Sequence, residues 1–157
     1  MNELTHNDEK RFSVLVVDDE PANIDILLGI LKPFYNVKVA PSGHVALKVV
    51  QQFTPDLILL DIMMPGMDGF EVCKKLKTDR ELARIPVIFV TALAQGEDEE
   101  KGFDVGAVDY ITKPVSPSIT LARVKTHLSL AHQMRTTEAL VNEKTKDLEL
   151  SQQSAIS

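Results

Sequence analysis

The chain alternates between short apolar runs and longer segments in which apolar residues recur every three or four positions. Uninterrupted apolar runs occupy residues 14–17, 57–60 and 87–90, and each run is too short for a helix. Such runs are typical of strands that are buried on both faces of a parallel sheet. Residues 37–40 and 109–112 mix polar and apolar positions, which predicts two less buried strands at the edges of that sheet.

The segments between these runs have helical spacing, so predicted strands and helices alternate along the chain. Residues 21–31 begin with a proline and repeat isoleucine and leucine on one face, while residues 69–78 separate an apolar face from a lysine-rich face. This alternation predicts an α/β fold, a doubly wound parallel sheet of five strands with right-handed crossovers. With the three apolar strands in the centre, the predicted strand order is 2-1-3-4-5.

A single long helix is expected from Ser116 onward, because no glycine or proline follows Pro117. Its first turns carry a dense apolar stripe. Further along, Met134, Val141 and Leu148 recur at intervals of seven residues in a shifted phase. This narrow seam has the spacing of a two-helix coiled coil with a register break. We therefore expect a homodimer that forms through the C-terminal helix.

Side chains with catalytic or ligand-binding chemistry follow four of the predicted strands. Asp18 and Asp19 follow the first strand and Asp61 the third, while Thr91 follows the fourth and Lys113 the fifth. The carboxyl ends of parallel strands meet at one edge of an open sheet, where α/β proteins bind ligands. Clustered carboxylates repel one another by about 4 kcal/mol per pair at a separation near 4 Å. Mg²⁺, which prefers oxygen ligands, offsets such repulsion.

The order and spacing of these motifs resemble one known family, the receiver domain of two-component response regulators. The resemblance covers residues 12–130 and implies the flavodoxin-like receiver fold. It rests on the following motifs: Asp18-Asp19, Asp61, Met64-Pro65-Gly66-Met67-Asp68-Gly69, Thr91-Ala92, Gly106-Ala107 and Asp109-Tyr110-Ile111-Thr112-Lys113-Pro114. A lone pair of aspartates would be weak evidence, but agreement at several separate strand ends is not expected by chance.

This resemblance implies a phosphorylation-controlled signalling switch. Asp61 is then the phosphoacceptor, and a sensor histidine kinase is the phosphodonor. The implied Mg²⁺ ligands are Asp18, Asp19, Asp61 and the backbone carbonyl of Met63. The implied phosphoryl-binding and switch residues are Thr91, Lys113 and Tyr110, the last as an aromatic side chain that turns inward. The resemblance also implies a cis peptide bond before Pro114. Such a receiver is not an enzyme beyond its own phosphorylation and dephosphorylation.

Two other functions compete with the switch. A Mg²⁺-dependent aspartyl-nucleophile phosphohydrolase also uses a strand-end aspartate. The motif of that enzyme class is Asp-x-Asp, however, and Met63 stands here at the position of the second carboxylate. An interaction module that is independent of phosphorylation is the second alternative, although it does not need a complete acidic site. Release of phosphate from unrelated esters would favour the enzyme.

Composition and charge restrict the partners and the location. A net charge of −6 and the absence of a basic cluster argue against a nucleic-acid surface. No apolar run approaches the roughly 20 residues of a membrane span, and cytoplasmic residence follows as the default. The single cysteine, Cys73, is expected in the core. The histidines have no ligand spacing and are expected at the surface, at positions His6, His44, His127 and His132.

The expected domain organisation has three parts. Residues 1–11 form a flexible N-terminal tail, residues 12–130 the receiver domain, and residues 131–157 a helical signalling linker whose output domain is absent. Residues 139–152 resemble the signalling helix that leads into HD-GYP domains, which hydrolyse cyclic di-GMP, so cyclic di-GMP turnover is the expected output. Diguanylate cyclases and hybrid kinases use similar connectors.

Overall fold

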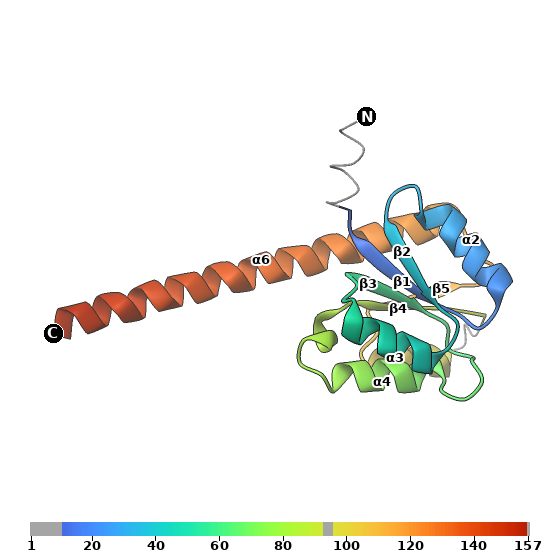
Figure 1. Cartoon of the computed structure of the whole chain (residues 1–157), viewed down its shortest axis with the longest axis horizontal. Helices are drawn as coiled ribbons and strands as arrows, with labels where there is room; N and C mark the ends of the chain where they lie inside the picture. Colours follow the sequence, from blue (N-terminus) through green and yellow to red (C-terminus); the bar gives the residue numbers. More distant parts are fainter. Residues whose placement is uncertain (1–10, 93–95, 157) are drawn as a thin grey trace.

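Five parallel strands form one sheet in the order β2-β1-β3-β4-β5 (Figure 1). The computed structural model describes the backbone of residues 11–92 and 96–156 and the side chains of residues 11–92 and 100–141. Of the expected tail, residues 1–10 therefore lie outside the described residues. The strands are β1 (Ser13–Val17), β2 (Asn36–Ala40), β3 (Leu57–Leu60), β4 (Val87–Thr91) and β5 (Asp109–Thr112). The strand order predicted by placing the three apolar strands in the centre of the sheet is confirmed.

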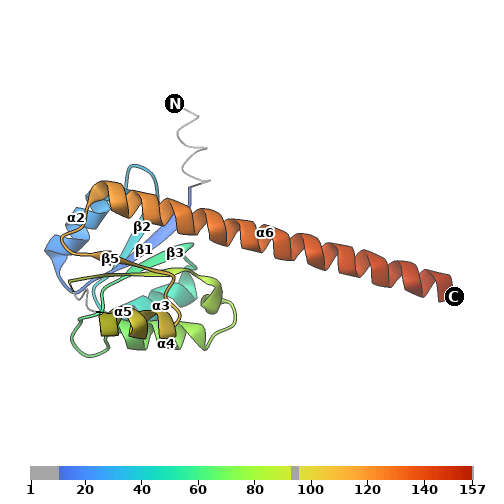
Figure 2. The same cartoon turned by 180° about the vertical axis from the view of Figure 1, so that it is seen from behind.

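Helices cover both faces of the sheet, as Figures 1 and 2 show. On one face lie α2 (Pro21–Leu31) and the first part of α6 (Pro117–Ile156). The opposite face carries α3 (Gly43–Gln52), α4 (Gly69–Lys77) and α5 (Gly96–Asp104), and a short 3-10 helix, η1 (Leu82–Arg84), leads into β4. Pro21 occupies the first turn of α2, as its fixed φ favours.

The core has two layers because successive strand residues point to opposite faces of the sheet. Leu15 and Phe89 belong to the cluster beneath α3 and α4, whereas Val16 and Ile88 belong to the cluster beneath α2 and α6. All four side chains are fully buried. By contrast, β2 exposes most of its residues, as predicted for an edge strand. Cys73 is a buried core residue, also as predicted.

The final helix packs on the sheet only through its first part. Val124 and Leu128 are 0% and 3% exposed, whereas Met134 and Val141 are 65% and 56% exposed. Beyond the sheet the helix projects away from the rest of the molecule (Figure 2). The long helix is confirmed, while the coiled coil stays a prediction because Leu148 lies outside the described side chains. Within the described part of the chain, none of the helices has the length and apolarity required to cross a bilayer.

Candidate functional site

Short loops at the carboxyl edge of the sheet place the acidic residues. Asp18 directly follows β1, and its Oδ1 accepts a hydrogen bond of 3.0 Å from the backbone N–H of Glu20. Asp61 directly follows β3, and its backbone N–H donates to the Val17 carbonyl at 2.9 Å. This last bond continues the pairing of β1 with β3 by one residue. Both carboxylates are thereby fixed at neighbouring strand ends.

The loop between β3 and α4 folds back on Asp61. Within this loop Gly66 has a φ of +79°, a backbone conformation that other residues rarely adopt. The N–H of Gly69 then donates to the Ile62 carbonyl at 2.8 Å. A Cβ atom on Gly69 would lie 2.2 Å from the Asp61 carbonyl oxygen, so only glycine permits this approach. The side chain of Asp68 caps α4 by accepting a hydrogen bond from the backbone N–H of Glu71.

Three carboxylates meet at this edge. Asp18, Asp19 and Asp61 each offer one oxygen, and these oxygens all lie within 4.8 Å of one another. Asp18 is 1% exposed and Asp61 is 5% exposed, whereas Asp19 is closer to solvent. The predicted convergence of the strand-end carboxylates is therefore present in the fold.

Lys113 brings the opposing charge from the end of β5. Its Nζ lies 2.8 Å from Asp18 Oδ2 and 3.5 Å from Asp61 Oδ2. The backbone N–H of Lys113 donates to the Thr91 carbonyl at 3.0 Å, which ties the ends of β4 and β5 together. The peptide bond between Lys113 and Pro114 is cis, as the family resemblance implies. Asp18, rather than Asp61, is the main partner of the ammonium group.

Burial and charge shift the pKa values of this cluster. Burial raises the pKa of Asp61 to about 6, and the Asp18 carboxylate adds to this effect, while the Lys113 charge opposes it. Burial alone would lower the pKa of Lys113, but the hydrogen bond from Lys113 to Asp18 and the nearby Asp61 charge outweigh it, so that this pKa is raised. One ammonium group thus faces three carboxylates, and the negative charge is incompletely balanced.

This donor set fits a divalent cation. Carboxylate oxygens are hard ligands of the kind that Mg²⁺ prefers, and the more exposed Asp19 leaves one side of the cluster open to water, which Mg²⁺ retains. Met63 is 64% exposed, and metal ligation by its backbone carbonyl stays a prediction. An open cleft beside this cluster is lined by Asp19, Met63 and Pro65, among other residues.

The remaining predicted residues, Thr91 and Tyr110, lie in β4 and β5. Thr91 ends β4 and is 1% exposed. Tyr110 lies in β5, and its ring centroid is 5.5 Å from that of Phe89 and 5.7 Å from that of Phe103. The tyrosine ring therefore packs between the central strand β4 and helix α5. Its role as a switch stays a prediction.

Comparison with known proteins identifies the family to which this arrangement belongs. The response regulator receiver domain matches residues 14–125. The chain belongs to this receiver family. Members of the family receive phosphate from histidine kinases and bind Mg²⁺ through an acidic cluster of aspartates. The receiver of Methanospirillum hungatei has a TM-score of 0.74 to this structure at 30% identity, covering 79% of this chain and 98% of that one.

Two longer proteins are similar to this chain. A probable cyclic di-GMP phosphodiesterase of Vibrio cholerae is 41% identical over 155 residues, covering 97% of this chain and 32% of the relative. The response regulator PleD of Caulobacter vibrioides is 46% identical over 113 residues, covering 71% of this chain and 25% of the relative. The chain therefore spans about a third or less of the length of these two relatives.

A second polar cluster was not predicted from the sequence. Asp109, at the start of β5, forms an ion pair with Arg123, and its Oδ2 lies 2.9 Å from His127 Nε2. The expectation that His127 is a surface residue is therefore wrong, because its side chain is only 17% exposed and contacts a carboxylate. His44 and His132 are exposed as expected, and His6 lies outside the described residues. Arg123 and His127 are four residues apart on α6 and therefore lie on the same face of the helix. This spacing was the sequence signal from which the cluster could have been predicted.

Proposed function

We propose that this receiver is a signalling switch that accepts a phosphoryl group on Asp61 from a sensor histidine kinase. The observation that carries this proposal is the convergence of Asp18, Asp19 and Asp61 within 4.8 Å, beside Lys113, at the carboxyl edge of the sheet. Asp61 is the most suitable nucleophile among the three carboxylates. It directly follows the central strand β3, and both Asp18 and Lys113 lie against it.

In the transfer step, an Asp61 carboxylate oxygen attacks phosphorus while the bond from phosphorus to the imidazole nitrogen of the kinase histidine breaks. The nitrogen keeps the electron pair and is then protonated, and Asp61 becomes an acyl phosphate. The side chains of Asp18, Asp19 and Asp61 and the Met63 carbonyl would hold Mg²⁺, which would supply positive charge near the phosphoryl oxygens. Lys113 and the Thr91 hydroxyl donate to the remaining oxygens, and Tyr110 turns inward as the Thr91 loop closes.

The signal is proposed to leave the domain through α6. Its buried face ends at Leu128, and the described side chains from His132 to Val141 are exposed, which supports a boundary near residue 130 between receiver and linker. The stripe of Met134, Val141 and Leu148 is then the seam of a homodimer. Similarity to the Vibrio cholerae relative over nearly the whole chain favours cyclic di-GMP turnover as the output that α6 controls.

A phosphorylation assay distinguishes the switch from the phosphohydrolase and from the phosphorylation-independent interaction module. We expect acetyl phosphate with Mg²⁺ to add one base-labile phosphoryl group, detected by intact mass and mapped to Asp61. Asp61→Asn should abolish the adduct, while Asp68→Asn, a matched change in the same loop, should retain it. An adduct that persists in Asp61→Asn on another residue would refute the assignment of the nucleophile. Steady phosphate release from unrelated esters would support the phosphohydrolase, although Met63 supplies no second acid.

A further inference from the structure

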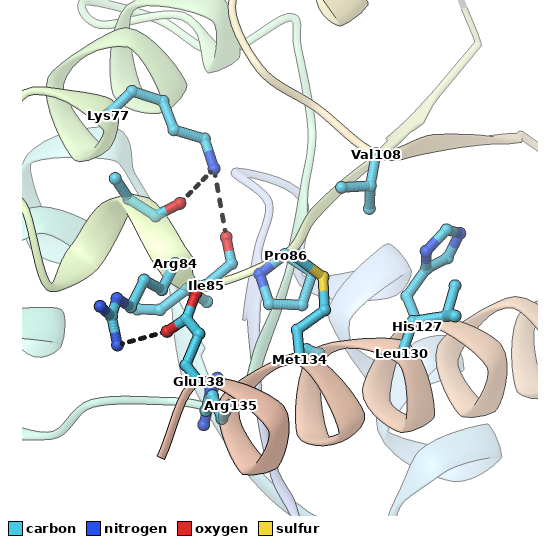
Figure 3. A pocket seen from close by; sticks show the side chains of 12 residues that line it. Lys77, Arg84, Ile85, Pro86, Val108, His127, Leu130, Met134, Arg135 and Glu138 are labelled. Carbon is cyan, nitrogen blue, oxygen red and sulfur yellow. Dashed lines mark hydrogen bonds and ion pairs between the residues drawn. The ribbon is translucent and has the colours of Figure 1, made fainter. Parts of the chain in front are cut away.

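A cavity separates α6 from the edge of the sheet opposite the phosphorylation site. It has a volume of about 520 Å³, which lies within the range of roughly 300–1,000 Å³ that is common for small-molecule sites. Its walls are mainly apolar and come from η1, the residues that directly precede β4 and β5, and α6. The apolar lining includes Ile85, Pro86, Val108, Leu130, Ala131 and Met134. Figure 3 shows Met134 and Leu130 on α6 along one side and Lys77 reaching in from α4 on the other.

Lys77 gives this apolar cavity a cationic wall. Its Nζ donates to the carbonyl oxygens of Ala83 at 2.9 Å and Ile85 at 3.4 Å. An ammonium group has three donors, so one remains for another acceptor. Across residues 11–92 and 100–141, no carboxylate forms an ion pair with Lys77. Burial accordingly lowers the pKa of Lys77, and its charge lacks an anionic partner.

The other charged groups of the lining are already matched within the chain. Arg84 pairs with Glu138 at 3.2 Å, and Arg135 lies 3.6 Å from Asp56 (Figure 3 draws the first pair). His127 contacts Asp109 in the cluster described above. Among the described residues that line the cavity, both arginines are thus paired with carboxylates, and Lys77 carries the positive charge that is not paired in this way. In a chain of net charge −6, this is a locally cationic cavity that suits an anion.

We propose that this cavity binds a carboxylate that carries an apolar chain or ring. The carboxylate accepts from Lys77 Nζ, and the apolar part replaces water against Pro86, Leu130 and Met134. Such a ligand touches both α6 and the body of the receiver, so its binding stabilises the docked position of α6. This site lies at the opposite edge of the sheet from Asp61 and does not depend on the proposed phosphorylation.

Calorimetric titration of the full chain with decanoate, below the concentration at which decanoate forms micelles, tests the proposal. We expect saturable binding of one decanoate and at least about ten-fold weaker binding of decanol, the loss that one charge-assisted hydrogen bond represents. Naphthoate serves as the aromatic carboxylate. If either acid binds more tightly than decanol, the proposal is supported. Tighter binding of decanoate than of naphthoate indicates a lipid-derived ligand, and the reverse order indicates an aromatic one.

Two variants and one control locate the ligand. Lys77→Met keeps an apolar side chain without the ammonium and should weaken decanoate binding to the level of decanol. Ala131→Trp fills the cavity and should abolish binding of both compounds. Lys75→Met, an exposed change on the same helix, should bind decanoate like the wild type. Equal affinity of the wild type for decanoate and decanol, undiminished binding in Ala131→Trp, or no binding at all would each overturn the proposal.

Discussion

Replacing Asp61 by asparagine should make the metal-free protein more stable at neutral pH, although it removes the proposed phosphoacceptor. Burial, with the Asp18 charge, raises the pKa of Asp61 from an ordinary 3.8 to about 6 despite the opposing charge of Lys113. Each unit of difference between folded and unfolded pKa values corresponds to about 1.4 kcal/mol. The charged carboxylate therefore costs the fold about 3 kcal/mol, and asparagine avoids this cost.

The pH dependence of this gain has a definite sign. Below pH 3.8 the Asp61 carboxyl is protonated in both the folded and the unfolded chain, so its contribution is constant. Between pH 3.8 and about 6 the unfolded chain has released the proton that the folded chain still holds. Wild-type stability then falls by about 1.4 kcal/mol per pH unit relative to Asp61→Asn. Above this window the difference stays near its maximum.

Urea unfolding of both proteins in the presence of a chelator, at several pH values from 4 to 8, measures this difference. Asp68→Asn is the matched control, because asparagine caps a helix as well as aspartate does. Its stability relative to the wild type should change little across the same range. Mg²⁺ should reduce the difference in unfolding free energy between Asp61→Asn and the wild type at pH 8, since it should bind the complete acidic cluster of the wild type more tightly than the cluster of the variant. A gap of the same size at pH 4 and pH 8, or a less stable Asp61→Asn at pH 8, would refute the electrostatic argument.

Three further predictions concern the loop, the metal and the dimer. Gly69→Ala should destabilise the fold by about 1–3 kcal/mol in urea unfolding, because its Cβ meets the backbone of Asp61. Gly29→Ala, where a Cβ contacts nothing within 4 Å, should instead be neutral or stabilise α2 by up to about 1 kcal/mol. Asp19→Ala should weaken Mg²⁺ binding in calorimetry without unfolding the protein. Val141→Glu should weaken dimerisation, measured by sedimentation. A wild-type chain that sediments as a monomer even at high concentration would disprove the dimer.

The sequence predicted the sheet and its acidic edge well because both depend on short-range patterns. Uninterrupted apolar runs identified β1, β3 and β4 as central strands. Parallel strands place their carboxyl ends along one edge, so the residues that follow the strands had to converge there. The close approach of Gly69 to Asp61 was not predicted, because it depends on the path of the whole loop.

The contacts of α6 could not be read from the sequence. Asp109 lies 14 residues before Arg123, and their pairing depends on how α6 is rotated and placed against β5. Two basic residues four positions apart on a helix are also typical of a solvated face. The same reasoning applies to Lys113, whose preference for Asp18 over Asp61 depends on distances that differ by less than 1 Å.

The geometry of the site limits where the free energy for the proposed switch can come from. A ligand that binds two conformations equally shifts nothing, so Mg²⁺ would contribute to the proposed switch only if it bound the phosphorylated conformation more tightly. If Lys113 moves away from Asp18, 2.8 Å from its Nζ, to reach a phosphoryl oxygen, the loss of that contact cancels part of the gain. A hydrogen bond from the Thr91 hydroxyl to a phosphoryl oxygen contributes about 1.5–3 kcal/mol. Moving an equilibrium from 1:99 to 99:1 needs about 5.5 kcal/mol, so the Thr91 bond alone is insufficient, and we expect repacking around Tyr110 to contribute to the remainder.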